Sequence, residues 1–274
     1  EDYAMTPSDL RECLHRGQTV FGTLIVSPSP RWPEVVANCG LDFVFIDTEH
    51  IALDRAQLSW MCQTYAALGI PPIVRIPSPD PHAATMVLDG GAAGIIAPYV
   101  ESVEQVQELR GAVKMRPIKG RKLQAMLAGE SAESELEHYI RERASKRILI
   151  VNIESVPAMD ALDEILRVPD LDGVLIGPHD LSCRLGVPEQ YDHPTFLDAC
   201  ETIFRKARAA NVGAGIHFWG DAAQQTRFLK LGANMLIHSA DISLFQKHLQ
   251  LELAAIKKAV GISSDDTTSS TPVI

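Results

Sequence analysis

Residues 20–30 read VFGTLIVSPSP, an apolar run of strand length that passes directly into a repeated Ser-Pro pair. An open, doubly wound α/β sheet normally carries a glycine-rich phosphate loop after its first strand. The segment Ser27-Pro28-Ser29-Pro30 is not such a loop. The other common α/β architecture is a closed barrel of parallel strands, and this stretch favours the barrel over the open sheet.

Similar short apolar runs recur along the chain and alternate with longer stretches of helical spacing. The runs are nearly all apolar, as is typical of parallel strands buried on both faces. Strands are predicted at residues 20–26, 43–47, 73–76, 94–97, 148–153, 173–176, 213–217 and 235–238. Helices are predicted at residues 31–38, 54–68, 82–89, 102–113, 158–166, 194–210, 222–231 and 242–260. A short N-terminal helix capped at Thr6 or Ser8 is predicted as well.

A strand followed by a helix, repeated eight times, is the pattern of a (β/α)8 TIM barrel. We therefore predict a single α/β barrel domain over residues 1–262. The last segment, residues 263–274, reads SSDDTTSSTPVI and is polar and low in complexity. We expect it to be a disordered C-terminal tail.

Composition and charge exclude several classes of partner. The net charge of −10 argues against nucleic acid, because binding phosphates requires a basic surface. No apolar run reaches the roughly 18 residues of a membrane-spanning helix, so no membrane partner is expected. The five cysteines are odd in number and widely spaced, which predicts reduced thiols in a cytoplasmic protein.

Residues 114–146 interrupt the alternation of strands and helices and are too long for an ordinary connection. A basic stretch comes first, and an acidic helix is predicted at residues 130–142. Three interpretations remain open for this excursion: a lid, a contact between subunits, or a solvated surface segment.

Two carboxylates follow adjacent predicted strands, at the end of the barrel where TIM-barrel active sites lie. Glu154 follows the fifth strand, and Asp180 follows the sixth. Hard oxygen ligands of this kind suit Mg²⁺, Mn²⁺ or a similar divalent ion that keeps positions for water and substrate. The alternative is that each residue simply caps the helix that follows it.

Arg75 and His50 are the candidates for catalysis at the same rim. Arg75 ends an apolar strand and needs an anionic or carbonyl partner, either a substrate or the carboxylates of Asp47 and Glu49. His50 follows these two acidic residues closely, and a histidine oriented by a carboxylate is a common general base near neutral pH.

Several motifs, in this order, resemble the HpcH/HpaI aldolase family of class II pyruvate aldolases, within the phosphoenolpyruvate/pyruvate barrel superfamily. The likeness covers the chain from about residue 20 to about residue 245. It rests on Asp47-Thr48-Glu49-His50, Val74-Arg75-Ile76-Pro77, Leu88-Asp89-Gly90-Gly91-Ala92, Ile153-Glu154-Ser155 and Gly177-Pro178-His179-Asp180-Leu181-Ser182.

The resemblance implies a metal-dependent carbon–carbon lyase that cleaves a 4-hydroxy-2-oxo acid to pyruvate and an aldehyde through an enolate. Glu154 and Asp180 would hold Mg²⁺, Mn²⁺ or Co²⁺. Arg75 would stabilise the enolate oxygen. His50 would move the proton, assisted by Asp47 or by Asp89 of a neighbouring subunit.

The resemblance also implies a pyruvate site and an assembly. The backbone at Gly177 and His179 would bind the pyruvate carboxylate. Asn152 and His217 would line the same site, at positions where relatives often have glutamine and an apolar residue. Family members are usually hexamers, so we expect a homo-oligomer such as a hexamer.

Two other functions also fit the sequence. One is an enzyme that decarboxylates oxaloacetate or uses the resulting enolate to form a carbon–carbon bond, since residues 43–50 also resemble a superfamily member with that chemistry. The other is a barrel without turnover that serves as a binding or scaffold protein.

Overall fold

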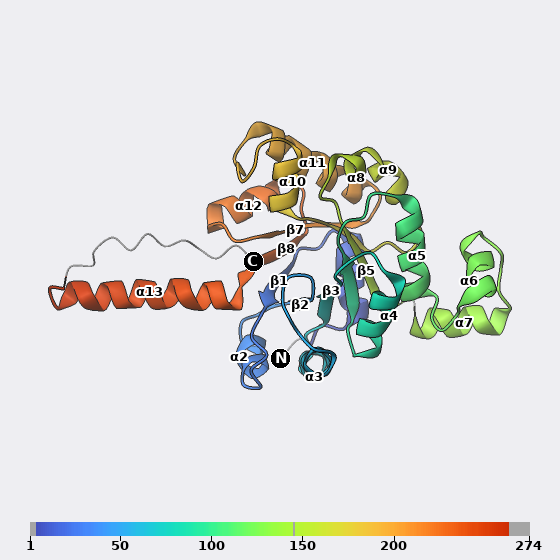
Figure 1. Cartoon of the computed structure of the whole chain (residues 1–274), viewed down its shortest axis with the longest axis horizontal. Coiled ribbons are helices and arrows are strands. Elements are labelled where there is room, and N and C mark those ends of the chain that lie inside the picture. The colour runs from blue at the N-terminus through green and yellow to red at the C-terminus, as the bar shows by residue number, and fades with distance from the viewer. Residues whose placement is uncertain (1–3, 145, 263–274) are drawn as a thin grey trace.

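The eight apolar runs form a closed parallel barrel in the computed structural model, which describes residues 4–144 and 146–262. Each strand pairs with the next in sequence, and the last pairs with the first (Figure 1). The strands are β1 (Val20–Ile25), β2 (Phe43–Asp47), β3 (Pro72–Arg75), β4 (Gly94–Ala97), β5 (Ile148–Asn152), β6 (Gly173–Ile176), β7 (Gly213–Phe218) and β8 (Met235–Ala240). The predicted (β/α)8 TIM barrel is confirmed. The predicted tail, residues 263–274, lies outside the described residues.

Helices alternate with the strands, and most begin at a residue suited to the position. Thr6 and Asp54 each cap a helix through a capping box, as their short polar side chains allow. The helices are α1 (Pro7–Arg16), α2 (Trp32–Ala37), α3 (Arg55–Ala67), α4 (Pro81–Asp89), α5 (Val103–Lys114), α6 (Gly120–Leu127), α7 (Ser134–Arg143), α8 (Val156–Asp160), α9 (Leu162–Ile165), α10 (Pro178–Arg184), α11 (Pro194–Ala209), α12 (Ala222–Lys230) and α13 (Asp241–Ala259). The helix predicted at residues 158–166 is divided into α8 and α9, and the sequence pattern does not predict α6 or α10.

The apolar residues form two cores, one between the strands and the helices and one inside the barrel. Residues Phe45, Ile73 and Ile150 belong to the inner core. Side chains alternate between the two faces of a strand, so the residue two positions later on each strand faces inward as well. On β2, β3 and β5 these next positions are Asp47, Arg75 and Asn152, and the inner core therefore becomes polar at the carboxyl ends of the strands.

A buried ion cluster closes the opposite end of the barrel. Asp172, directly before β6, is fully buried. Its carboxylate accepts hydrogen bonds from Arg11 Nε at 2.6 Å and Lys114 Nζ at 2.5 Å, and it lies 2.8 Å from His15 Nε2. Since Arg11 and His15 belong to α1, this cluster holds the N-terminal helix against this end of the barrel.

Two parts of the chain project from the barrel in Figure 1. The hairpin of α6 and α7 fills the predicted excursion, and neither helix has a buried residue. The last helix, α13, extends away from the strands that precede it. Among the described residues, no helix is both long and apolar enough to cross a membrane.

Candidate active site

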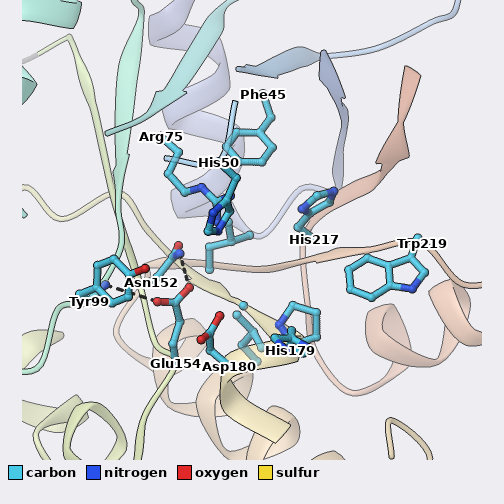
Figure 2. A pocket seen from close by; sticks show the side chains of 14 residues that line it. Phe45, His50, Arg75, Tyr99, Asn152, Glu154, His179, Asp180, His217 and Trp219 are labelled. Atoms are coloured by element: carbon cyan, nitrogen blue, oxygen red, sulfur yellow. Dashed lines mark hydrogen bonds between the residues drawn. The ribbon is translucent and has the colours of Figure 1, made fainter. Parts of the chain in front are cut away.

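A pocket of about 250 Å³ opens at the carboxyl ends of the strands (Figure 2). All the predicted site residues line it except Asp47 and Asp89. Asp47 is fully buried directly behind Arg75. Asp89 ends α4, is largely exposed and forms an ion pair with Arg116, so it does not reach the pocket of its own chain.

Glu154 and Asp180 enter the pocket from neighbouring segments, Glu154 just after β5 and Asp180 in the first turn of α10. Figure 2 shows their carboxylates beside each other. Burial, with a smaller contribution from the charge of Asp180, raises the pKa of Glu154 to about 7. The charge of Asp180 therefore lies close enough to affect the ionisation of Glu154.

Glu154 is held by its neighbours in one orientation. Its Oε1 accepts a hydrogen bond from Asn152 Nδ2 at 2.5 Å, and its Oε2 accepts one from the backbone N–H of Tyr99 at 3.3 Å. A Cβ atom at Gly177 would lie 2.4 Å from Glu154 Oε1. Only glycine therefore leaves room for the Glu154 carboxylate at this point.

The donor set around Glu154 fits a divalent cation that keeps open positions. Within residues 4–144 and 146–262, no cluster of three or more His, Cys, Asp or Glu side chains forms a complete metal cage. Two carboxylates, Glu154 and Asp180, are present, and the buried Oδ1 of Asn152 has no hydrogen-bond partner in this part of the chain. Hard oxygen donors of this kind suit Mg²⁺ or Mn²⁺ with water and substrate as further ligands.

Arg75 lies at the centre of a network of acidic residues. Its Nε and one terminal nitrogen donate to the two oxygens of Asp47 at 2.8 and 2.7 Å, and Nε lies 3.2 Å from Glu49 Oε2. Burial opposes ionisation of Asp47, but the hydrogen bond and charge of Arg75 outweigh it and lower the pKa of this carboxyl. The guanidinium also lies over the ring of Phe45, at 5.4 Å. Arg75 is thus fixed where it lines the pocket.

His50 stands at the pocket with a half-exposed side chain. Its Nε2 lies 3.6 Å from Glu49 Oε1, while its backbone N–H donates to Asp47 at 3.3 Å. The carboxylate nearest to the imidazole is therefore that of Glu49, and Asp47 instead fixes the backbone of the loop and the guanidinium of Arg75.

Tyr99 is a pocket residue that the sequence reasoning missed. It follows β4 at the same rim, and its backbone has a φ of 57°, in the left-handed region that few residues adopt. Its hydroxyl donates to Glu49, and this hydrogen bond is the first cause that raises the pKa of Tyr99 to about 12. Its position two residues after the end of an apolar strand is the signal that could have identified it.

The histidines at the ends of β7 and β8 face opposite ways. His217 lines the pocket, together with Trp219. His238 lies outside the barrel and not at the pocket rim, with its Nδ1 2.8 Å from Gln225 Nε2. The reason is strand alternation, because Ile237 is the residue of β8 that faces the inner core. His179 lines the pocket with a half-exposed ring, 3.4 Å from Glu189.

Comparisons with known proteins agree with this geometry. The model of the HpcH/HpaI aldolase/citrate lyase family matches residues 22–247. The 2-keto-3-deoxy-L-rhamnonate aldolase of Klebsiella pneumoniae is 32% identical over 254 residues, which cover 93% of this chain and 95% of that protein. The structure of an HpcH/HpaI aldolase from Desulfitobacterium hafniense has a TM-score of 0.78 at 29% identity and covers 93% of this chain and 97% of its own. Macrophomate synthase, with a TM-score of 0.74 at 24% identity over 94% of this chain and 92% of its own, shares the fold.

Proposed function

Because the chain belongs to the HpcH/HpaI aldolase/citrate lyase family and is a carbon–carbon lyase of the aldolase type, we propose that it cleaves a 4-hydroxy-2-oxo acid to pyruvate and an aldehyde with the aid of a divalent metal. The observation that carries this proposal is the pair of carboxylates, Glu154 and Asp180, beside each other in a pocket that also contains Arg75 and His50. These four side chains supply a cation site, an anion-stabilising group and a base within one small cavity.

Glu154 and Asp180 would hold the cation, which we propose to be Mg²⁺, Mn²⁺ or Co²⁺. When bound, it would supply a Lewis acid for the 2-oxo acid. The raised pKa of Glu154 supports this assignment, since a carboxyl that resists ionisation when alone gains from a nearby cation. Gly177 and His179, next to Asp180, would bind the substrate carboxylate, and Asn152 would keep Glu154 in place.

In the cleavage step, the bond between C3 and C4 breaks and the hydroxyl on C4 loses its proton. His50 is the residue we assign to take this proton, since its ring faces the pocket and Glu49 lies within 3.6 Å. Arg75 would donate to the oxygen on C2, where the electrons of the broken bond collect as an enolate. Asp47 and Glu49 hold Arg75 for this role, so its orientation is set before substrate binds. A proton delivered to C3 then completes pyruvate. Asp89 is proposed to assist only from a neighbouring subunit.

The test is pyruvate release from a panel of 4-hydroxy-2-oxo acids and CO₂ release from oxaloacetate, with and without EDTA. We expect wild-type cleavage to fall by at least about a hundredfold on chelation and Glu154→Gln to be equally slow with metal present. Asp198→Asn, at an exposed carboxylate on α11, is the matched control and should keep full activity. Unchanged turnover after chelation would contradict the proposal. Faster release of CO₂ than of pyruvate would instead support an oxaloacetate decarboxylase or an enzyme that forms carbon–carbon bonds from its enolate.

We also propose that the chain forms a homo-oligomer by exchanging α13 between copies. In a (β/α)8 barrel the eighth helix packs on the outside of the barrel. Here most of α13 points away, and a groove of about 890 Å³ lies on the outer face of β1 and β8, between α2 and α12, with Leu244 and Phe245 of the first turns of α13 also in its lining. Its lining includes Phe21, Trp32, Val35, Leu229 and Leu236.

The exposed apolar side chains of α13 match this groove in chemistry. They are Ile242, Leu244, Phe245, Leu249, Leu251, Leu253 and Ile256. A solvent-exposed helix of this composition is unfavourable in water, and a groove left open by the same helix is unfavourable for the same reason. Reciprocal exchange between two copies would bury both surfaces. The proposed location is the cytoplasm, where the free thiols of buried Cys62 and Cys200 would stay reduced.

A further inference from the structure

The pocket has two chemically different sides. Glu154, Asp180 and Asn152 form the polar side, and the rings of Phe45, His217 and Trp219 lie opposite (Figure 2). The ring of His217 packs edge-on against Phe45 at 5.4 Å and lies 6.3 Å from Trp219, between the two. If the 2-oxo acid occupies the polar side, this aromatic wall faces the rest of the substrate, which leaves as the aldehyde.

One hydrogen bond fixes the tautomer of His217. Its Nε2 lies 3.0 Å from the backbone oxygen of Ser239. A carbonyl oxygen can only accept, so the proton of the neutral ring is on Nε2 and Nδ1 carries a lone pair. In the part of the chain that the structure describes, no hydrogen-bond partner is found for Nδ1. The ring therefore offers the pocket a fixed acceptor.

The charge on this wall is also fixed. Burial lowers the pKa of His217 to about 4, so the ring is neutral at neutral pH. Arg75, the one arginine or lysine that lines the pocket in the described residues, is already bound by Asp47 and Glu49. The aromatic wall thus provides no cation for a second carboxylate on the leaving fragment, but it does provide a partner for a hydroxyl group.

We propose, on the basis of the aldol cleavage above, that His217 is a specificity-determining residue that accepts a hydrogen bond from a hydroxyl group of the aldehyde fragment. The aldehyde class is then a neutral hydroxyaldehyde rather than an unsubstituted aldehyde or an aldehyde acid. A site built around such an acceptor disfavours an analogue without the hydroxyl, because the buried lone pair is left unpaired.

The test uses the aldol direction, with pyruvate and three aldehydes: glycolaldehyde, acetaldehyde and succinic semialdehyde. Glycolaldehyde and acetaldehyde differ by one hydroxyl group, so the ratio of their kcat/KM values isolates its contribution. We expect wild type to favour glycolaldehyde by about tenfold or more, and His217→Leu to reduce this ratio to near one. His217→Asn, which keeps an acceptor oxygen, should restore part of the preference. His82→Leu, on the exposed face of α4, is the matched control.

Exchange of the pyruvate methyl protons in D₂O separates this inference from the proposed function. The exchange needs enolate formation but no aldehyde, so wild type and the His82→Leu control should both show it, and the aldehyde ratio of His217→Leu is judged only where its exchange is also detected. An unchanged aldehyde ratio with intact exchange, or a wild-type preference for acetaldehyde or succinic semialdehyde, would overturn the role of His217 alone. A wild-type enzyme that does not exchange pyruvate protons with any of the three metals would overturn the proposed function as well.

Discussion

The carboxyl group of Glu154 connects metal binding to pH. Its pKa is about 7, chiefly because it is buried, whereas a carboxyl in water ionises near 4. Below pH 7 a cation must displace this proton, and above pH 7 the site is already ionised. We therefore predict that the Kd for Mn²⁺ rises by about tenfold for each pH unit below 7 and levels off above it.

Isothermal titration at pH 6 and pH 8, in two buffers with different enthalpies of protonation, measures the released proton directly. Close to one proton should be released at pH 6 and little at pH 8. Glu154→Gln has no such proton and should bind Mn²⁺ weakly at both values. Equal affinity of the wild type at pH 5.5 and pH 7 would show that Glu154 is not a ligand.

At the scale of residues, the sequence predicts which side chains follow a strand, but it does not predict which other side chain each of them contacts. Glu154, Asp180 and Arg75 lie at the ends of apolar strands, and the barrel brings them together as expected. The His50 ring lies beside Glu49 because of the backbone conformation of the loop after β2. The spacing of apolar residues in the sequence does not predict that conformation. Tyr99 was missed because a tyrosine after a strand resembles an ordinary core residue.

The attachment of α1 is a prediction at the scale of elements. Asp172 binds Arg11 of α1, Lys114 at the end of α5 and the backbone N–H of Leu149 on β5. Burial opposes its ionisation, but the charges of Lys114 and Arg11 and the hydrogen bonds of His15 and Lys114 together outweigh burial and lower the pKa of Asp172. Asp172→Asn should therefore lower the free energy of unfolding by about 3–5 kcal/mol, because it leaves the buried ammonium group of Lys114 without this carboxylate.

Urea denaturation checks this prediction. Asp170→Asn is the matched control, since Asp170 forms longer and more exposed ion pairs and its loss should cost less than about 1 kcal/mol. The folded-state pKa of Asp172 lies below its unfolded value, so its contribution is complete above about pH 4 and is lost as the pH falls further. A loss below 1 kcal/mol in Asp172→Asn at pH 7 would show that the cluster does not hold α1.

Among the elements, the strands were predictable because they are buried on both faces and thus almost purely apolar. The helices that lack a long apolar stripe could not be predicted in this way. The helix α10 has only seven residues and begins with a proline directly after Gly177. Seven residues are too few for apolar side chains to show a helical period. No residue of α6 is buried, so no pattern of burial marks it in the sequence.

At the scale of the whole molecule, the sequence predicts that a helix follows β8 but not where it packs. The predicted range, 242–260, nearly coincides with α13. Apolar spacing shows that a helix face is to be buried, yet a groove on the same chain and an identical groove on a second copy offer it the same contacts. The strand β8 ends at Ala240 and α13 begins at Asp241, so no connecting residue separates the two elements.

Exchange of α13 makes a prediction for both sides of the proposed interface. Leu253→Glu, on the projecting part of α13, and Val35→Glu, on the wall of the groove, should each convert the wild-type oligomer to monomer in sedimentation velocity, because a charge buried in an apolar contact costs several kcal/mol. Gln250→Glu introduces the same charge on the same helix at an exposed polar residue and should leave the oligomer intact. If Leu253→Glu dissociates the oligomer and Val35→Glu does not, α13 pairs with another surface. A monomeric wild type at micromolar concentration would rule out exchange, and the groove and the helix would then both remain exposed in solution.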